Sequence, residues 1–212
     1  MTKYILPILI FIAAPAMAVD NCLKPKMDYT RDCADISNIN NLPTLARAGD
    51  CAELLIDARS HWNASGLRLE QGKQYQLEVI AADQWCDGNV VTNYQGWDVS
   101  KQGQRPGSAH CPKNKECAKC KDKKAVNGPM VNLGTATNSL ISIKWLRRKA
   151  DSRLFALVGL LKGEQERSKP FEIVNQFIIP DHTAEFCAYA NDASLMYGNN
   201  SGQLTLKIRR IK

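Results

Sequence analysis

The sequence predicts an all-β protein, an antiparallel β-sandwich that carries a Cys-rich insertion and an N-terminal extension. Three observations support this fold class. Short runs of β-forming residues recur between turn signals, apolar and polar residues alternate within several of these runs, and helical periodicity is nowhere sustained. Such spacing is typical of two packed antiparallel sheets with long loops at their ends.

The first eighteen residues are expected to be a secretory signal peptide. Lys3 precedes an apolar run from Tyr4 to Ala14, and Ala16-Met17-Ala18 supplies the small residues of a cleavage site. The apolar run is too short to span a bilayer. Val19-Asp20-Asn21 lacks the small apolar residues that precede a lipidated cysteine. We therefore expect an exported protein, periplasmic or secreted, without a membrane span.

Eight cysteines follow this segment, at positions 22, 33, 51, 86, 111, 117, 120 and 187. An even number in an exported protein favours a disulfide framework of up to four bridges, whose connectivity stays open. Residues 19–51 hold three cysteines in a polar, turn-rich stretch. We expect this stretch to be an N-terminal extension pinned by disulfides, with a short helix near Leu42 to Arg47, and residues 52–212 to form one sandwich domain.

The expected strands follow one another along this domain. They are Ala52 to Ala58, Leu67 to Leu69, Lys73 to Ile80, Ser139 to Trp145, Leu154 to Leu161, Phe171 to Ile179, Glu185 to Ala190 and Gln203 to Ile208. Tyr75, Leu77 and Val79 should share one face because side chains alternate along a strand. The continuous apolar run from Leu154 should be buried on both faces. From Gly88 to about Asn138 the alternation stops, which indicates a loop insertion, about residues 100–138, stapled by bridges.

The formal net charge is +7, and the basic residues form clusters. Six lysines lie between Lys113 and Lys124 in the insertion, and shorter basic runs occur at residues 147–149 and 209–212. An exported basic protein could meet anionic lipid headgroups, acidic glycans or an acidic protein, but a charge run is also an ordinary solvated surface. Nucleic acid is not expected as a partner, because no aromatic residues interleave with the basic ones.

Few residue patterns point to catalysis. His110 and the three cysteines that follow it have the ligand types of a zinc site, but disulfide bonding competes for these thiols in an exported chain. Ser60 adjoins His61, yet neighbours in an extended chain point to opposite faces. The sequence contains no nucleophile elbow, zinc-protease helix or nucleotide-binding glycine loop. We therefore do not expect an enzyme.

The four tryptophans allow two interpretations. A large aromatic ring at strand spacing is usually a core residue, whereas an exposed ring can stack on the apolar face of a sugar. Trp62 and Trp145 are expected in the core. Trp85 and Trp97 flank loops, and for them both interpretations stay open.

The segment Asn191–Gly202 carries more oxygen donors than a turn before a strand requires. Asp192, Asn199 and Asn200 offer side-chain oxygens, and a residue such as Met196 offers a backbone carbonyl. Calcium prefers about six to eight hard oxygen ligands, so these residues could converge on one ion. The alternative is a polar turn whose Asp and Asn side chains cap their own backbone.

The stretch from Tyr189 to Ile208 resembles the C-terminal signature of the bacterial PA-I (LecA-type) galactophilic lectins. Asn191-Asp192, a four-residue spacer, the run from Tyr197 to Gly202 and an alternating final strand carry the similarity. Weaker similarity covers residues 62–97 and 154–159. The resemblance implies a jelly-roll, galactose-binding-domain-like β-sandwich in which calcium bridges protein and a galactose-like carbohydrate.

The resemblance also implies a ligand set. Asp192, Asn199 and Asn200 would bind the metal and the sugar through their side chains, Met196 would bind the metal through its carbonyl, and a further carbonyl would come from near Asp87. His110 would stand in for a sugar-contacting histidine of the family. The family's Pro-Gly in the spacer is Ser194-Leu195 here, and the aromatic residue expected near Asp87 is missing.

We therefore expect an exported, calcium-dependent, lectin-like protein. The alternative is a periplasmic interaction or immunity-type protein that keeps the fold and binds an acidic exported protein through its basic insertion. A third possibility, an envelope hydrolase, would require clustered carboxylates or histidines in one cleft, which the sequence does not indicate.

Overall fold

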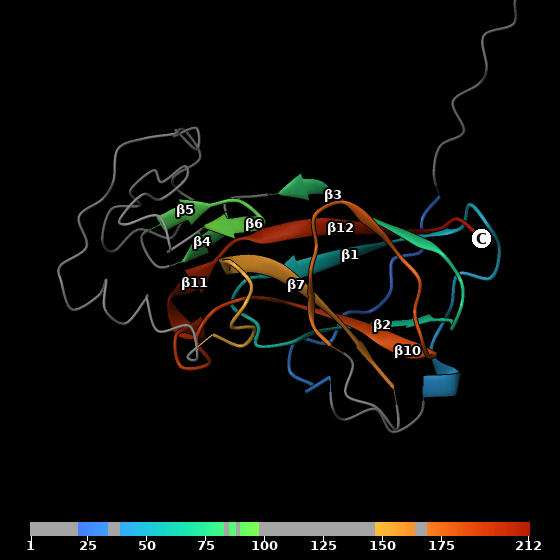
Figure 1. Ribbon diagram of the computed structural model, residues 1–212, viewed down its shortest axis with the longest axis horizontal. Helices are drawn as coiled ribbons and strands as arrows, with labels where there is room; N and C mark the ends of the chain where they lie inside the picture. Colours follow the sequence, from blue (N-terminus) through green and yellow to red (C-terminus); the bar gives the residue numbers. More distant parts are fainter. Residues whose placement is uncertain (1–20, 34–38, 83–84, 88–89, 98–146, 164–168) are drawn as a thin grey trace, which may run out of the picture.

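The computed structural model describes residues 21–33, 39–82, 85–87, 90–97, 147–163 and 169–212 (Figure 1). The expected signal peptide, the strand expected at Ser139 to Trp145, most of the insertion and His110 lie outside the described residues. Within the described ranges, no helix has the length and apolar character needed to cross a membrane.

The described chain folds into three sheets, whose named strands all pair antiparallel. The first contains, in spatial order, β1 (Cys51–Asp57), β12 (Gln203–Arg210), β3 (Tyr75–Ala82) and β9 (Gln176–Ile178). The second contains β2 (Asn63–Leu69), β10 (Ala184–Ala190), β7 (Leu154–Lys162) and β6 (Gln95–Trp97), with β8 (Phe171–Glu172) also paired to β7. The third contains β11 (Asn200–Ser201), β4 (Trp85–Asp87) and β5 (Val90–Thr92). The predicted all-β sandwich is confirmed.

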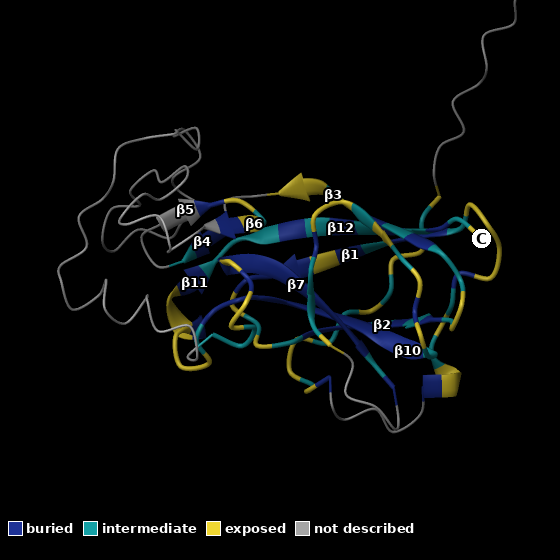
Figure 2. Cartoon of the chain, viewed as in Figure 1, coloured by how far each residue is buried: buried dark blue, intermediate teal, exposed yellow. Residues whose placement is uncertain are grey.

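One apolar core lies between the two larger sheets (Figure 2). The first sheet contributes alternate residues, such as Leu204, Leu206 and Ile208 of β12, because every second side chain of a strand faces the same side. β7 of the second sheet is buried at every position from Leu154 to Leu161, as its continuous apolar sequence predicts. Burial of these side chains supplies the main stabilisation of the fold, and it anchors the strand that follows the oxygen-rich loop.

Residues 21–33 bind along the edges of both large sheets. Leu23 pairs with Ala52 of β1, and Asp28 pairs with Ala64 of β2. Two disulfides, Cys22–Cys51 and Cys33–Cys187, tie the segment to the sandwich, and Cys86 is disulfide-bonded as well. The segment thereby covers two strand edges that would otherwise be open to pairing. The disulfides indicate that the chain folds in an oxidising, extracytoplasmic environment.

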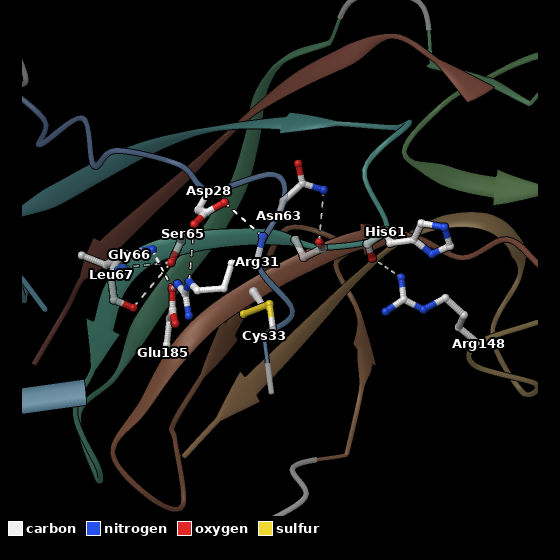
Figure 3. The surroundings of a disulfide bond; sticks show 12 residues. Asp28, Arg31, Cys33, His61, Asn63, Ser65, Gly66, Leu67, Arg148 and Glu185 are labelled. Atoms are coloured by element: carbon white, nitrogen blue, oxygen red, sulfur yellow. Dashed lines mark hydrogen bonds and ion pairs between the residues drawn. A yellow bond between two sulfur atoms is a disulfide. The ribbon is translucent and has the colours of Figure 1, made fainter. Parts of the chain in front are cut away.

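A partly buried ion pair joins the same segment to β10. Arg31 Nη2 lies 2.6 Å from Oε1 of Glu185, which also accepts a hydrogen bond from the Gly66 backbone N–H at 2.8 Å (Figure 3). The Glu185 side chain is fully buried, so its charge depends on these two partners. The N-terminal segment therefore contributes to the stability of the sandwich.

The helix predicted at Leu42 to Arg47 is wrong. The structure has a 3-10 turn earlier, at Ile39–Asn41, and none over the predicted range. Here the carbonyl groups of Leu45 and Ala46 accept hydrogen bonds from Nη1 of Arg210, at 2.7 and 2.8 Å. Bonds to β12 thus replace the local bonds that a helix would need, and tertiary contacts override the local preference.

The single strand predicted over Phe171 to Ile179 is also wrong, because the segment forms β8 and β9 in different sheets. Asn175, between them, has a φ of 57°, and its side chain accepts a hydrogen bond from the Val79 N–H at 2.9 Å. Asparagine tolerates this left-handed backbone better than most residues. The chain therefore turns at Asn175 and crosses from one sheet to the other.

Two short strands occupy the start of the region predicted to be an irregular insertion. β5 pairs with β4, and β6 pairs with β7. Both are three residues long, too short to show the alternation from which a strand is recognised in sequence.

Candidate functional site

The oxygen-rich loop between β10 and β12 lies at one end of the sandwich, with β4, β5 and β6 beside it (Figure 1). Within the loop, β11 pairs with β4 and places Asn200 opposite Asp87, which is 113 positions away in the chain numbering. The structure thus places Asp87 beside the loop, the region in which the family resemblance implied a further ligand.

Asp192 and Asn200 form the buried floor of the loop, with exposures of 4% and 3%. Oδ1 of Asp192 accepts the Ala193 N–H at 2.6 Å, and Nδ2 of Asn200 donates to the Ala58 carbonyl at 3.3 Å. The other carboxylate oxygen, Asp192 Oδ2, and the single side-chain oxygen of Asn200, Oδ1, have no hydrogen-bond partner. Buried polar atoms are nearly always paired, so two such oxygens in one loop indicate a place for a cation or a donor.

Burial raises the pKa of the Asp192 carboxyl group, because the charged form loses its hydration. The Ala193 N–H and the Asn200 side-chain amide lower this pKa to a smaller extent. These two contacts offset only part of the cost of burying the charge, and a cation beside the carboxylate would offset more of it.

Met196 and Asn199 lie at the exposed rim of the loop. The Met196 carbonyl accepts the Asn199 backbone N–H at 3.1 Å and keeps a second lone pair. The Asn199 side chain donates to Oδ1 of Asp87 at 3.5 Å, a long bond. Four of the predicted ligands therefore lie within one short loop: Asp192, Met196, Asn199 and Asn200. Asp87 lies beside this loop, on the strand that pairs with it.

A site here would be made mostly of amide and carbonyl oxygens. Among the residues that the structure describes, no three His, Cys, Asp or Glu side chains gather as a metal-binding group. His110, expected to contact a sugar, lies outside those residues.

Asn191 holds the loop against the turn at residues 147–153, a role that sequence reasoning missed. Its side chain is fully buried. Oδ1 accepts the Lys149 N–H at 2.9 Å, and Nδ2 donates to the carbonyls of Lys149 and Arg153 at 3.0 and 2.9 Å. The only sequence signal was its position beside Asp192, since the turn that it binds is about forty positions away.

Tyr197 supports the loop from beneath. Its hydroxyl donates to the Ala190 carbonyl and accepts a hydrogen bond from Nη1 of Arg148 at 2.9 Å. Burial raises the pKa of this phenol to about 12. Its ring stacks on that of the exposed His61, with 4.2 Å between centroids.

The burial of two tryptophans differs from what the sequence led us to expect. Trp62, expected in the core, is only half-buried and packs against the guanidinium of Arg148. Trp85, left open between core and sugar platform, is fully buried, and its indole N–H donates to the Phe155 carbonyl at 2.9 Å. Trp85 is thus a core residue, and Trp62 packs against the Cys33–Cys187 disulfide on one side while remaining partly open to solvent. Trp145 and the side chain of Trp97 lie outside the described part of the chain.

Comparison of the chain with models of known families, with curated proteins and with solved structures finds no match.

Proposed function

We propose that the protein binds a calcium ion in the loop formed by Asp192, Met196, Asn199, Asn200 and the adjoining Asp87, and that the ion holds a carbohydrate. The observation that carries the proposal is the pair of buried oxygens without partners, Asp192 Oδ2 and Asn200 Oδ1. One cation between them would satisfy both. The donors are all oxygens, the ligand type that calcium prefers.

The division between floor and rim supports ligand binding at the ion. Asp192 supplies a buried negative charge and Asn200 a neutral oxygen, while Met196 and Asn199 are exposed. Calcium takes about six to eight oxygens, more than this loop's floor offers. Two vicinal hydroxyl groups of a sugar can complete such a shell from the solvent side. Calcium, when bound, would supply Lewis-acid contacts to those hydroxyls.

The finer assignments rest on the resemblance to the galactophilic lectins. It favours a galactose-like sugar and a periplasmic or secreted location. The half-buried Trp62 and the exposed His61 add aromatic surface beside the loop, which suits the apolar face of a sugar ring.

The test is isothermal titration calorimetry of the chelator-treated protein with calcium, and then with methyl galactoside in the presence and absence of calcium. We expect calcium binding in the wild type, its loss in Asp192→Asn, and its retention in Asp181→Asn, which changes an exposed carboxylate elsewhere. Sugar binding should disappear on adding chelator. A wild type that releases no heat with calcium, or binds sugar equally well with chelator, overturns the proposal.

A further inference from the structure

Arg148 is held between aromatic rings beside the loop. Its Cζ atom lies 3.8 Å from the centroid of Trp62 and 3.7 Å from that of Tyr189. The two rings meet edge to face, with centroids 5.3 Å apart. Cation–π attraction to both rings fixes the plane of the guanidinium.

Among the residues that the structure describes, only Nη1 of this guanidinium has hydrogen-bond partners. Nη1 donates to the His61 carbonyl (Figure 3). It also donates to the Tyr197 hydroxyl. Nε and Nη2 donate to none of the described residues, and they are not buried atoms without partners, so solvent reaches them. No acidic side chain in the described ranges forms an ion pair with Arg148.

The unused nitrogens form the edge that suits a carboxylate. The Nε–H and one Nη2–H of a guanidinium point in parallel, so they can bind both oxygens of a carboxylate at once. Most surface arginines lose side-chain freedom when they bind in this way. Here the rings and the two Nη1 bonds have already ordered the group, which lowers the entropic cost of binding.

Arg148 lies next to the loop of the proposed calcium site. Tyr197, which accepts the Arg148 bond, stands in the loop between Met196 and Asn199. Arg147, the preceding residue, forms an isolated bridge with Ala193 of the same loop. A ligand seated on the rim of the loop would therefore have beside it an ordered positive charge that no described acidic residue pairs with.

We propose that Arg148 determines specificity, selecting carbohydrates that carry a carboxylate, the uronic acids, over neutral sugars. The inference rests on the proposed function, since calcium would hold the ring hydroxyls while Arg148 binds the carboxylate. A charge-assisted, two-point bond of this kind is expected to tighten binding by roughly 10- to 100-fold.

The test compares methyl galacturonoside with methyl galactoside by calorimetry in calcium. The proteins are the wild type, Arg148→Lys and Arg153→Lys. Arg148→Lys keeps the positive charge but removes the two parallel N–H groups that would bind a carboxylate. Arg153→Lys makes the same change at an exposed position of the same turn. We expect the wild type and Arg153→Lys to prefer the uronide by about tenfold or more, and Arg148→Lys to bind both ligands with the galactoside affinity of the wild type.

The outcomes separate the two proposals. Equal wild-type affinity for the two ligands overturns the role of Arg148 and leaves calcium-dependent sugar binding standing. An unchanged preference in Arg148→Lys shows that net charge alone is responsible, and equal loss of both ligands shows that Arg148 only supports the loop; either result overturns the inference. Failure of the wild type to bind either ligand overturns the proposed function and this inference together.

Discussion

Replacing the proposed metal ligand Asp192 by asparagine should stabilise the calcium-free protein. The Asp192 carboxylate is buried, and its Oδ2 has no partner. In Asp192→Asn the side-chain oxygen can still accept the Ala193 N–H, and the new amide can donate to Oδ1 of Asn200, which also lacks a partner. One substitution would thus remove a buried charge and satisfy two polar atoms.

The magnitude follows from these two atoms. A buried polar group without a partner costs about 1–3 kcal/mol, so Asp192→Asn should gain about that amount without calcium. For a domain of this size, 1 kcal/mol shifts Tm by about 2–4 °C, which predicts a rise of several degrees. Calcium at about 100 times its Kd would stabilise the wild type by about 2.7 kcal/mol and leave the variant unchanged, which cancels or reverses the order of the two proteins.

The gain should also depend on pH in a defined direction. Because the folded pKa of Asp192 is raised above the ordinary value of 3.8, the folded state holds its proton more tightly than the unfolded state. The wild type therefore loses stability as pH rises from 3.8 through the folded pKa, and the penalty persists above it. The advantage of Asp192→Asn should be complete at neutral pH and shrink as pH falls toward 3.8.

The assay is thermal unfolding followed by circular dichroism at pH 7, first in chelator and then in excess calcium, with Asp181→Asn as the control. The control should follow the wild type in both buffers. If Asp192→Asn melts below the wild type in chelator, the carboxylate is already compensated within the protein. If calcium raises both proteins equally, Asp192 is not a ligand.

Three further experiments test other parts of the structure. Arg31→Met should lower the free energy of unfolding by about 3 kcal/mol, seen in urea titration, because it leaves the buried Glu185 charge with one neutral bond. Adding Glu185→Met to this variant should recover most of the lost stability. If it recovers none, the loss does not come from leaving the Glu185 charge without Arg31. Cys33→Ser with Cys187→Ser should cost about 2–5 kcal/mol in the same titration, because the bridge joins residues 154 positions apart; a cost below about 1 kcal/mol would show that other contacts already order the segment. Tyr197 should remain protonated at pH 11 in ultraviolet difference titration, and its raised pKa means that stability falls as pH rises from about 10 toward 12; ionisation near pH 10 would show that the ring is open to water.

Local pattern was sufficient for the main strands. The alternation in Gln203 to Ile208 and the continuous apolar run from Leu154 identify strands because a strand's burial repeats every two residues or covers every position. The oxygen-rich loop was visible for a similar reason, since Asp192, Asn199 and Asn200 lie within nine consecutive residues.

Pattern failed where distant partners decide the conformation. The sequence from Phe171 to Ile179 is predicted as one strand. In the structure β8 pairs with β7 and β9 pairs with β3, and the chain turns at Asn175 between the two sheets. Leu42 to Arg47 is predicted as a short helix, but the carbonyl groups of Leu45 and Ala46 accept hydrogen bonds from Arg210.

The sequence by itself determined the all-β class, the order of the long strands and the loop where oxygens crowd, because each follows from residues that are neighbours in the chain. Only the tertiary structure decided which atoms in that loop are left without partners, that Asp87 lies opposite Asn200, and that Arg148 sits between Trp62 and Tyr189. These depend on strand register and on burial, which are set by how whole sheets pack and are not encoded in any short stretch of residues.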